Sequence, residues 1–395
     1  MRRAFLASAG YDRTDLQRPI VGIVDTSSDY NTCHARMPEL VEGVKRGVLE
    51  AGGLPLVFPT ISLHEILFHP TTMYYRNMLA METEEVLRCH PIDAAVLMGG
   101  CDKTTPALLM GAISADIPVI YLPCGPMLTA RLGGETLGSG HAGWKYWAER
   151  CAGNLSDAEW SAVENAIGRS PGHCMTMGTA STMGAIAESL GFCLPGASSI
   201  PAMVSEHMRM STACGRRAVE LAWDNLKPSD ILTRESFENA ITVAVSMGGS
   251  TNVVLHLLAI AREAEVDLTL EDFDRISRNT PYIADMKPAG RYVMADLSRY
   301  GGIALVMKRL LSAGLLHGDA VTVTGKTIAE NIQATETVED QPVVVTIDKP
   351  RSPTGGLAIL RGNLAPEGAV IKAVSYTHLR AHETDSYLVC RLLLE

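Results

Sequence analysis

No uninterrupted hydrophobic run in this 395-residue sequence is long enough to span a membrane. The longest uncharged stretch, 241–261, is broken by the mostly small and polar residues 246–252, and it predicts a buried strand, a turn and a buried helix. The N-terminal apolar run is short and is followed at once by Asp12, Arg13 and Asp15, which argues against a secretory signal. We therefore expect a cytoplasmic protein.

Runs of basic residues are also absent. The 34 Lys and Arg residues are outnumbered by 44 Asp and Glu residues, which gives a net charge of −10. This balance disfavours a nucleic-acid partner and an anionic membrane surface. Hydrophobic residues make up 47% and charged residues 20%, so the composition is that of a folded chain with a large core, and disorder over most of the chain is excluded.

The cysteine pattern excludes two common roles. The nine cysteines include no C-x-x-C pair and no zinc-finger spacing. Their number is odd and they are scattered along a long chain, so a disulfide framework is not expected. Most should be buried structural thiols, because free cysteine is among the most buried residue types.

Apolar, β-rich segments alternate with helical patterns in the first part of the chain. Near-continuous apolar strands that alternate with helices predict a parallel sheet covered on both faces. Ligands of such sheets bind beyond the C-terminal ends of the strands, and Cys33 and Cys101 follow the first and third strands. The predicted strands are 19–25, 54–58, 93–98 and 118–122, and helical patterns cover 38–51 and 77–89.

The rest of the chain has a different pattern. Helices are predicted to dominate 155–315, and β-rich segments follow at 321–324 and 342–347. A Pro- and Gly-rich segment that begins at 349 predicts a domain boundary. We expect an α/β domain over 1–348, then a linker and the first part of a C-terminal β-rich, barrel-like domain over 349–372.

Four polar segments carry candidate functional groups. Residues 99–106 place a thiol, a carboxylate and an amine at a strand end, and 25–34 form a polar loop after a strand. Residues 170–182 and 248–252 are small and polar and open helices, where backbone N–H groups can bind an anion. Each has a purely structural alternative: a strand-to-helix turn, a solvated loop, or a tightly packed buried turn. A Walker A motif near residue 325 is excluded, because Ala320 stands where the motif requires a glycine.

Three of these motifs together resemble the dihydroxy-acid dehydratase / phosphogluconate dehydratase family of iron–sulfur lyases. They are Thr32-Cys33-His34, 99–106 and 172–183. The intervals between their cysteines, 101 − 33 = 68 and 174 − 101 = 73, suit the three cluster ligands of that family. The resemblance covers about 19–372, and three motifs in order at matching spacing argue against a chance match. A nucleotide-binding α/β protein is the unrelated alternative, but the chain lacks a sound phosphate loop.

Within the family the chain is closer to the sugar-acid branch, of which the arabinonate-type aldonate dehydratases are an example. The segments that carry this likeness are 62–65 and 70–77. The branched-chain biosynthetic branch usually has Asp where this chain has Glu65. The resemblance therefore implies a hydro-lyase that dehydrates a 2,3-dihydroxy sugar acid to a 2-keto-3-deoxy acid, with branched-chain dihydroxy-acid dehydratase as the alternative.

The resemblance also implies an iron–sulfur cluster held by Cys33, Cys101 and Cys174, expected as [2Fe–2S] with [4Fe–4S] as the alternative. Three thiolates leave one iron position open, and that iron can act as a Lewis acid on the substrate C3 hydroxyl. The cysteines that match no cluster motif are expected to be structural: Cys89, Cys124, Cys151, Cys193 and Cys214.

A magnesium site is implied beside the cluster. Mg²⁺ prefers hard oxygen ligands, which Glu65 and Asp102 supply. Lys103 would be a third ligand if carbamylated, as in the family. The metal would hold the substrate C1 carboxylate and C2 hydroxyl.

The family pattern is expected to stop near residue 373. Residues 373–395 are interpreted as an out-of-family, artefactual tail, with an amphipathic helix as the alternative. The family draws a further Mg²⁺-binding glutamate and a serine base from its C-terminal domain, so the catalytic base is unassigned here. We expect a truncated, inactive chain that binds cluster and metal, with a small sugar acid as ligand and, at full length, a homo-oligomer (dimer or tetramer).

Overall fold

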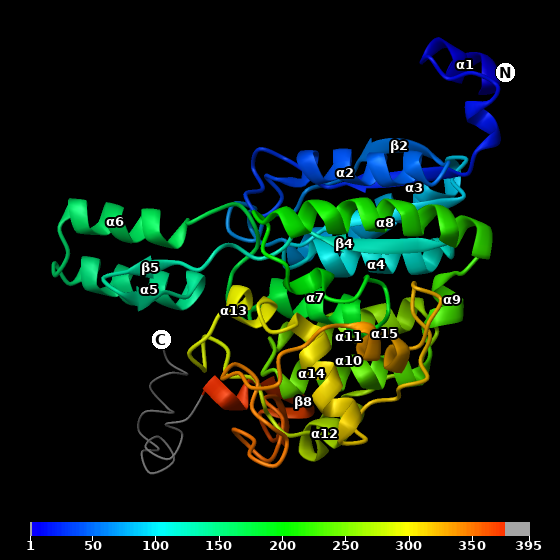
Figure 1. Cartoon of the computed structure of the whole chain (residues 1–395). Helices are drawn as coiled ribbons and strands as arrows, with labels where there is room; N and C mark the ends of the chain where they lie inside the picture. The colour runs from blue at the N-terminus through cyan, green and yellow to red at the C-terminus, as the bar shows by residue number, and fades with distance from the viewer. Residues whose placement is uncertain (1, 376–395) are drawn as a thin grey trace.

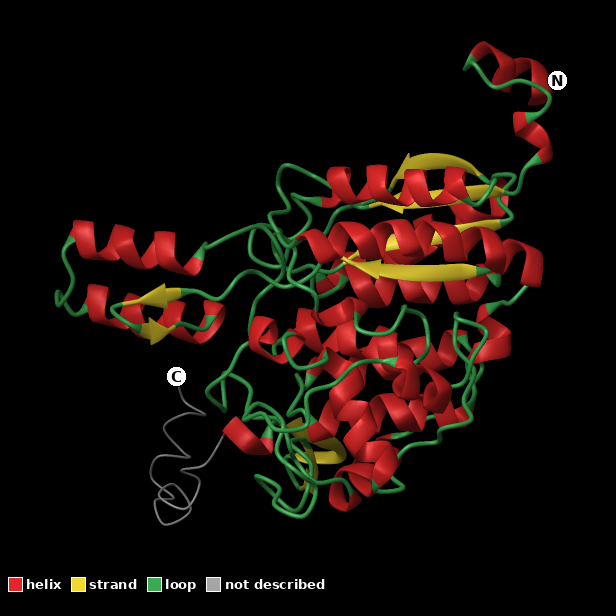
Figure 2. Ribbon diagram, viewed as in Figure 1, coloured by secondary structure: helices red, strands yellow, loops and turns green. Residues whose placement is uncertain are grey.

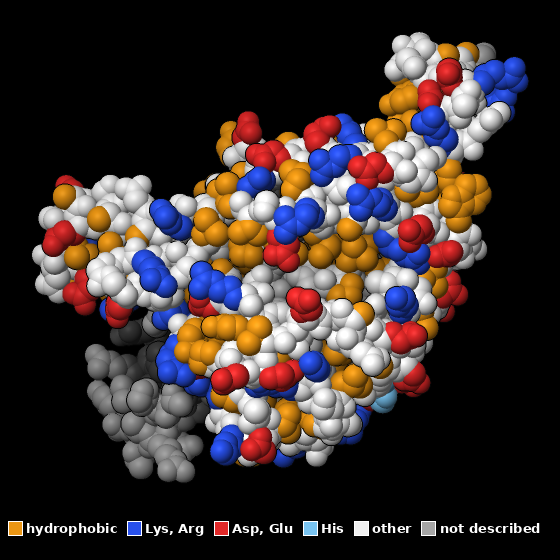
Figure 3. Space-filling model, in the orientation of Figure 1, with side chains coloured by type: hydrophobic (Ala, Val, Ile, Leu, Met, Phe, Trp, Pro, Cys, Tyr) orange, Lys and Arg blue, Asp and Glu red, His pale blue; other side chains and the backbone are white. Residues whose placement is uncertain are grey.

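The structure is a computed structural model, and it describes residues 2–375. Most of the expected tail, 376–395, therefore lies outside the described residues. Among the helices of 2–375, none has the length and apolar character that a membrane crossing requires. Acidic and basic side chains are interspersed on the face of the molecule shown in Figure 3.

A four-stranded parallel sheet organises the first third of the chain, as predicted (Figure 2). Its strand order is β2-β1-β3-β4, and every neighbouring pair is parallel. Asp25 pairs with Met98 and Gly99 pairs with Pro123, so the C-terminal ends of β1, β3 and β4 lie along one edge. The strands are β1 (Ile20–Asp25), β2 (Leu54–Pro59), β3 (Ala94–Gly99) and β4 (Val119–Pro123).

Helices cover this sheet in two pairs (Figure 1): α2 (Met37–Glu50) packs on α8 (Ser205–Asp224), and α3 (Met73–Cys89) packs on α4 (Thr104–Ala115). The α2–α8 crossing is unusually close. A Cβ atom on Gly47 would lie 2.0 Å from the carbonyl oxygen of Thr212, so this contact requires glycine.

The middle of the chain forms a helical layer beside the sheet, again as predicted (Figure 1). At its centre is α7 (Thr179–Ser189), whose residues are all buried. The other helices of this half are α9 (Pro228–Ile231), α10 (Arg234–Ser246), α11 (Asn252–Glu263), α12 (Leu270–Asn279), α13 (Met294–Ser298), α14 (Gly302–Ser312) and α15 (Ile328–Ala334). Short 3₁₀ turns lie at Asp15–Gln17, Ala197–Ser199 and Ala373–Ser375.

The prediction of a strand at the start of 241–261 is wrong, because residues 241–246 form the second half of α10. Its residues are apolar and β-branched, and they are buried on all sides. A short apolar run of this kind does not distinguish a buried strand from a buried helix. The helix begins at a capping box in which the Thr233 side chain accepts from the Ser236 N–H, and packing against α7 and α12 maintains it.

The strands expected at 321–324 and 342–347 are also absent from the described residues. Val321 and Val344 each form only an isolated bridge, to Thr327 and Ala284. In the second segment, the Gln341 side chain accepts hydrogen bonds from the N–H groups of Val343 and Val344 at 2.7 and 2.9 Å. These donors are therefore unavailable to a neighbouring strand.

Two hairpins complete the fold. β7 (Ala358–Gly362) and β8 (Ala365–Ile371) pair antiparallel and pack on α12, so the strand-bearing segment expected after 357 is confirmed. A helical hairpin, α5 (Ser139–Cys151) and α6 (Asp157–Ile167), projects from the body together with the short strands β5 (Arg131–Leu132) and β6 (Glu135–Thr136) (Figure 1).

Candidate active site

The predicted cluster cysteines meet at the C-terminal edge of the sheet. Cys33 lies in the loop after β1, and Cys101 lies in the turn between β3 and α4. The Cys101 thiol is close enough to hydrogen-bond the Cys33 thiol, and this contact, with burial, raises the pKa of Cys33 well above its ordinary value. Charge on Cys174, in the loop before α7, raises the same pKa further. The structure thus brings all three together.

A fourth thiol, Cys124, lies beside these three and was expected to be merely structural. It follows β4 directly, and its charge also raises the pKa of Cys33. Its Sγ is so close to the β3–α4 turn that a Cβ on Gly100 would lie 2.1 Å from it. Its position immediately after the fourth predicted strand is its one signal in the sequence, and that signal does not by itself show that Cys124 meets the other thiols.

His34 holds the backbone of the cluster loop in place. Its Nδ1 donates to the carbonyl oxygen of Thr26 at 2.9 Å, so Nε2 is left as an acceptor. That atom accepts the N–H of Cys101 at 3.1 Å. Burial lowers the pKa of His34 to about 4, which keeps the ring neutral and preserves this tautomer at neutral pH.

The predicted magnesium ligands also meet. Lys103 Nζ lies 3.0 Å from Oε1 of Glu65, and the Thr72 hydroxyl donates to the other oxygen of the same carboxylate. Burial raises the pKa of Asp102, while the charge of Lys103 opposes that shift and the charge of Glu65 adds to it. Glu65 and Thr72 belong to 62–65 and 70–77, the two segments that carry the likeness to the sugar-acid branch. Both segments therefore contribute residues to this site.

The thiols and the carboxylates form one site rather than two. Burial raises the pKa of Cys174, and the charges of Asp102 and Cys101 add to that shift. Cys101, Asp102 and Lys103 are consecutive, so one turn of the chain joins the thiol group to the carboxylate group.

The donor types can be compared with the groups that the resemblance implies. Within 2–375, no three His, Cys, Asp or Glu side chains form a cluster that could hold a single metal ion. An iron–sulfur cluster makes a different demand, since its thiolates bind to more than one iron. Three neighbouring buried thiols therefore fit a cluster. Two carboxylates fit Mg²⁺, whereas the Lys103 ammonium is not a metal ligand unless it is modified.

An open cavity of about 600 Å³ adjoins this site at the N-terminus of α7. The hydroxyl of Thr179 hydrogen-bonds Asp102 and lies 2.9 Å from the Ser250 hydroxyl, and Asn252 Nδ2 donates to it at 2.9 Å. The polar segments 170–182 and 248–252 thus converge here. The lining residues used below are Trp144, Thr176, Thr179, Ser250, Thr251 and Lys372.

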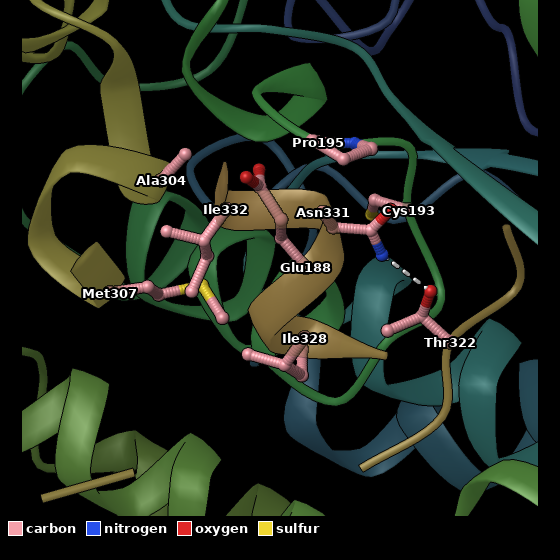
Figure 4. A pocket seen from close by; sticks show the side chains of 9 residues that line it. All are labelled: Glu188, Cys193, Pro195, Ala304, Met307, Thr322, Ile328, Asn331 and Ile332. Carbon is pink, nitrogen blue, oxygen red and sulfur yellow. Dashed lines mark hydrogen bonds between the residues drawn. The ribbon is translucent and has the colours of Figure 1, made fainter. Parts of the chain in front are cut away.

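A smaller cavity, shown in Figure 4, lies at the other end of α7 and has a different character. Glu188 lines it, but this carboxylate accepts the N–H groups of Gly196 and Ser198 at 2.7 and 3.1 Å. Asn331 Nδ2 donates to the Thr322 hydroxyl at 2.8 Å (Figure 4). These polar groups are satisfied within the fold, and burial raises the pKa of the Cys193 thiol, which also lines the cavity, well above its ordinary value.

Comparison with known proteins identifies the class. The chain belongs to the dihydroxy-acid/6-phosphogluconate dehydratase family, whose N-terminal model matches residues 18–331 and whose C-terminal model matches 342–389. The dehydratases of this family are hydro-lyases.

The individual relatives are similar to this chain over most of its length. It is 45% identical over 384 residues to the L-arabinonate dehydratase of Rhizobium leguminosarum bv. trifolii, covering 96% of this chain and 66% of the relative. It is 43% identical over 369 residues to the 6-deoxy-6-sulfo-D-gluconate dehydratase of Pseudomonas putida, covering 92% and 63%. It is 40% identical over 385 residues to dihydroxy-acid dehydratase 2 of Staphylococcus saprophyticus subsp. saprophyticus, covering 96% and 68%. The chain spans about two thirds of the length of these relatives.

These matches confirm the family and correct one expectation. The C-terminal family model extends to residue 389, so the expectation that the family pattern stops near 373, in a chain truncated at its C-terminal domain, is wrong. That expectation relied on interpreting a short segment as an artefactual extension that does not continue a barrel, and so short a segment is a weak indicator of family membership.

Proposed function

We propose that this chain carries the cluster-binding and metal-binding site of a sugar-acid dehydratase, which converts a 2,3-dihydroxy acid to a 2-keto-3-deoxy acid. The observation that carries the proposal is the turn Cys101-Asp102-Lys103. It joins buried thiols to a carboxylate and amine group at the edge of a parallel sheet. A cytoplasmic location and a homo-oligomeric state remain predictions.

The residues of the candidate active site fall into two groups according to the atoms they offer as ligands, sulfur or oxygen. Cys33, Cys101 and Cys174 would hold an iron–sulfur cluster, and His34 positions the backbone of Cys101. Glu65 and Asp102 would hold Mg²⁺. Bound there, the cluster would offer an open iron position as a Lewis acid for the departing hydroxyl, and Mg²⁺ would bind the substrate acid.

The cavity beside the site favours a sugar acid over a branched-chain acid. Hydroxyl groups of Thr176, Thr179, Ser250 and Thr251 line it, and such groups suit a ligand that carries several hydroxyls of its own. A branched-chain dihydroxy acid would place an aliphatic end against these hydroxyls. It is the second candidate because several relatives, among them the one from Staphylococcus saprophyticus, are named dihydroxy-acid dehydratase.

The decisive experiment combines reconstitution with a dehydratase assay. Protein reconstituted anaerobically with iron and sulfide should absorb in the visible range, and the Cys33/Cys101/Cys174→Ser triple variant should not. Cys214→Ser is the matched control, since that thiol is fully buried but lies in α8. A colourless wild-type protein contradicts the cluster. The formation of 2-keto acid from branched-chain substrates, with none from aldonates, would favour the second candidate.

A further inference from the structure

Lys372 directs its ammonium group into the cavity beside the candidate active site. The residue follows β8, and its Nζ donates to the carbonyl oxygen of Met177 at 3.2 Å. Met177 stands two positions before Thr179, whose hydroxyl hydrogen-bonds Asp102. Lys372 and Thr179 both line the cavity, so one cavity contains this ammonium and the hydroxyl that hydrogen-bonds Asp102.

This ammonium has no anionic partner among the described residues. None of the ion pairs formed within 2–375 includes Lys372, and its one acceptor is the neutral carbonyl of Met177. Burial lowers the pKa of Lys372 to about 8, which reflects the loss of water around the charged group. A partly buried cation without a counter-ion loses hydration that an anion could replace, so the site is complementary to an anion.

The groups around Lys372 indicate what kind of anion fits. The residues that line the cavity together with Lys372 include Thr176, Ser250 and Trp144, and no carboxylate is among the lining residues. An ammonium and several hydroxyls together match a small ligand with one negative group and several hydroxyls. A sugar acid has this chemistry.

We propose that Lys372 binds the carboxylate of the 2,3-dihydroxy acid substrate. The assignment rests on the proposed function and extends it, because it gives the acid group a second anchor besides the metal site. Two anchors on one carboxylate would fix the orientation of C2 and C3 relative to Cys101 and Asp102. Every candidate substrate of this site has a carboxylate, whereas a distal sulfonate or phosphate occurs in only some of them.

The test compares an aldonate with its carboxamide, which is uncharged and has an NH₂ group in place of one carboxylate oxygen. Mg²⁺ is present, and binding is measured by calorimetry. The wild-type chain should prefer the aldonate. Lys372→Met should lose about tenfold to a hundredfold of that preference, the range expected for one charge-assisted hydrogen bond. The matched control is Lys326→Met, which removes an exposed lysine in the 322–327 turn. It should keep the preference in full.

Lys372→Gln is the second variant, because it removes the charge and keeps a hydrogen-bond donor on a shorter side chain, and it should also lose the preference. An unchanged preference in a folded Lys372→Met or Lys372→Gln variant overturns the assignment and leaves the proposed function intact. A loss that appears only when 6-sulfo or 6-phospho acids are compared with their 6-hydroxy parent also overturns it, in favour of a distal contact. If the wild-type chain binds neither aldonate nor carboxamide, the proposed function fails, and this assignment fails with it.

Discussion

Lys103 and Glu65 form an ion pair with 3.0 Å between Nζ and Oε1, although 38 positions separate them in the sequence. The lysine side chain is 6% exposed and the glutamate side chain 32%. The pair joins the turn after β3 to the loop after β2, so it sets the spacing between two carboxylates, those of Glu65 and Asp102. Two predictions concern this pair, a third concerns the packing of α2 on α8, and a fourth concerns pH.

Lys103→Ala should abolish Mg²⁺ affinity and leave the absorption of the reconstituted cluster largely intact. The reason is that Lys103, once carbamylated, would be a third Mg²⁺ ligand beside Glu65 and Asp102, whereas its neighbour Cys101 belongs to the thiol group. Titration with Mg²⁺ and a visible spectrum on the same sample measure both effects. Unchanged Mg²⁺ binding would show that the carbamate assignment is wrong.

Glu65→Gln should destabilise the metal-free protein by about 1–3 kcal/mol, because it leaves the Lys103 ammonium buried with a weaker partner. In the double variant Lys103→Met/Glu65→Gln, the second substitution should cost much less, since the buried charge is gone. Urea denaturation of the four proteins gives the coupling free energy. Strict additivity of the two single effects would contradict a direct interaction.

Gly47→Ala should destabilise the fold by about 1–3 kcal/mol, because the new Cβ would lie 2.0 Å from the Thr212 carbonyl oxygen and force α2 away from α8. Gly362→Ala is the control, since a Cβ there meets nothing within 4 Å. Thermal unfolding of both variants measures the difference. Equal melting temperatures would mean that the two helices can separate without cost.

Stability should fall as the pH drops from about 6.5 toward 4, with His207 as one cause. Its Nε2–H donates to the carbonyl oxygen of Pro123 at 2.9 Å, and burial lowers the pKa of His207 to about 4. In that window the unfolded chain binds a proton that the folded chain does not, so the unfolding free energy decreases by up to about 1.4 kcal/mol per pH unit for this group.

His207→Gln tests this cause, because the amide can still donate to Pro123 but does not titrate. Its unfolding free energy, measured by urea denaturation at several pH values, should depend less steeply on pH between 4 and 6.5. The same slope in the variant and the wild-type chain would show that His207 does not contribute.

The sequence predicted the parts of the fold and of the candidate site that depend on local residue pattern. The ends of β1 and β3 can be located from the sequence because apolar runs precede polar turns, and this pattern alone places Cys33 and Cys101 on one edge of the sheet. The strand predicted at 241 failed because burial by α7 and α12 overrides the preference of β-branched residues. The strand predicted at 342–347 failed because a side chain, Gln341, occupies the backbone donors.

Two parts of the candidate site could not be read from the sequence. Cys124 has no motif of its own, and only the pairing of β3 with β4 brings it to the other thiols. Lys372 is distant in sequence from every motif, and it reaches the cavity only because the β7–β8 hairpin packs on α12 and returns the chain toward Met177. Both contacts are long-range, and neither hydrophobic periodicity nor motif spacing encodes them.

The turn Cys101-Asp102-Lys103 has a consequence for how this site can change over evolutionary time. Since adjacent residues on one short turn face two different groups, inserting or deleting a residue there would displace thiol, carboxylate and amine together. A substitution elsewhere can alter one group alone, as at Thr72 for the Glu65 carboxylate or at His34 for the Cys101 loop. New specificities should therefore arise first in the cavity wall around Trp144 and Thr251, where a change disturbs neither group.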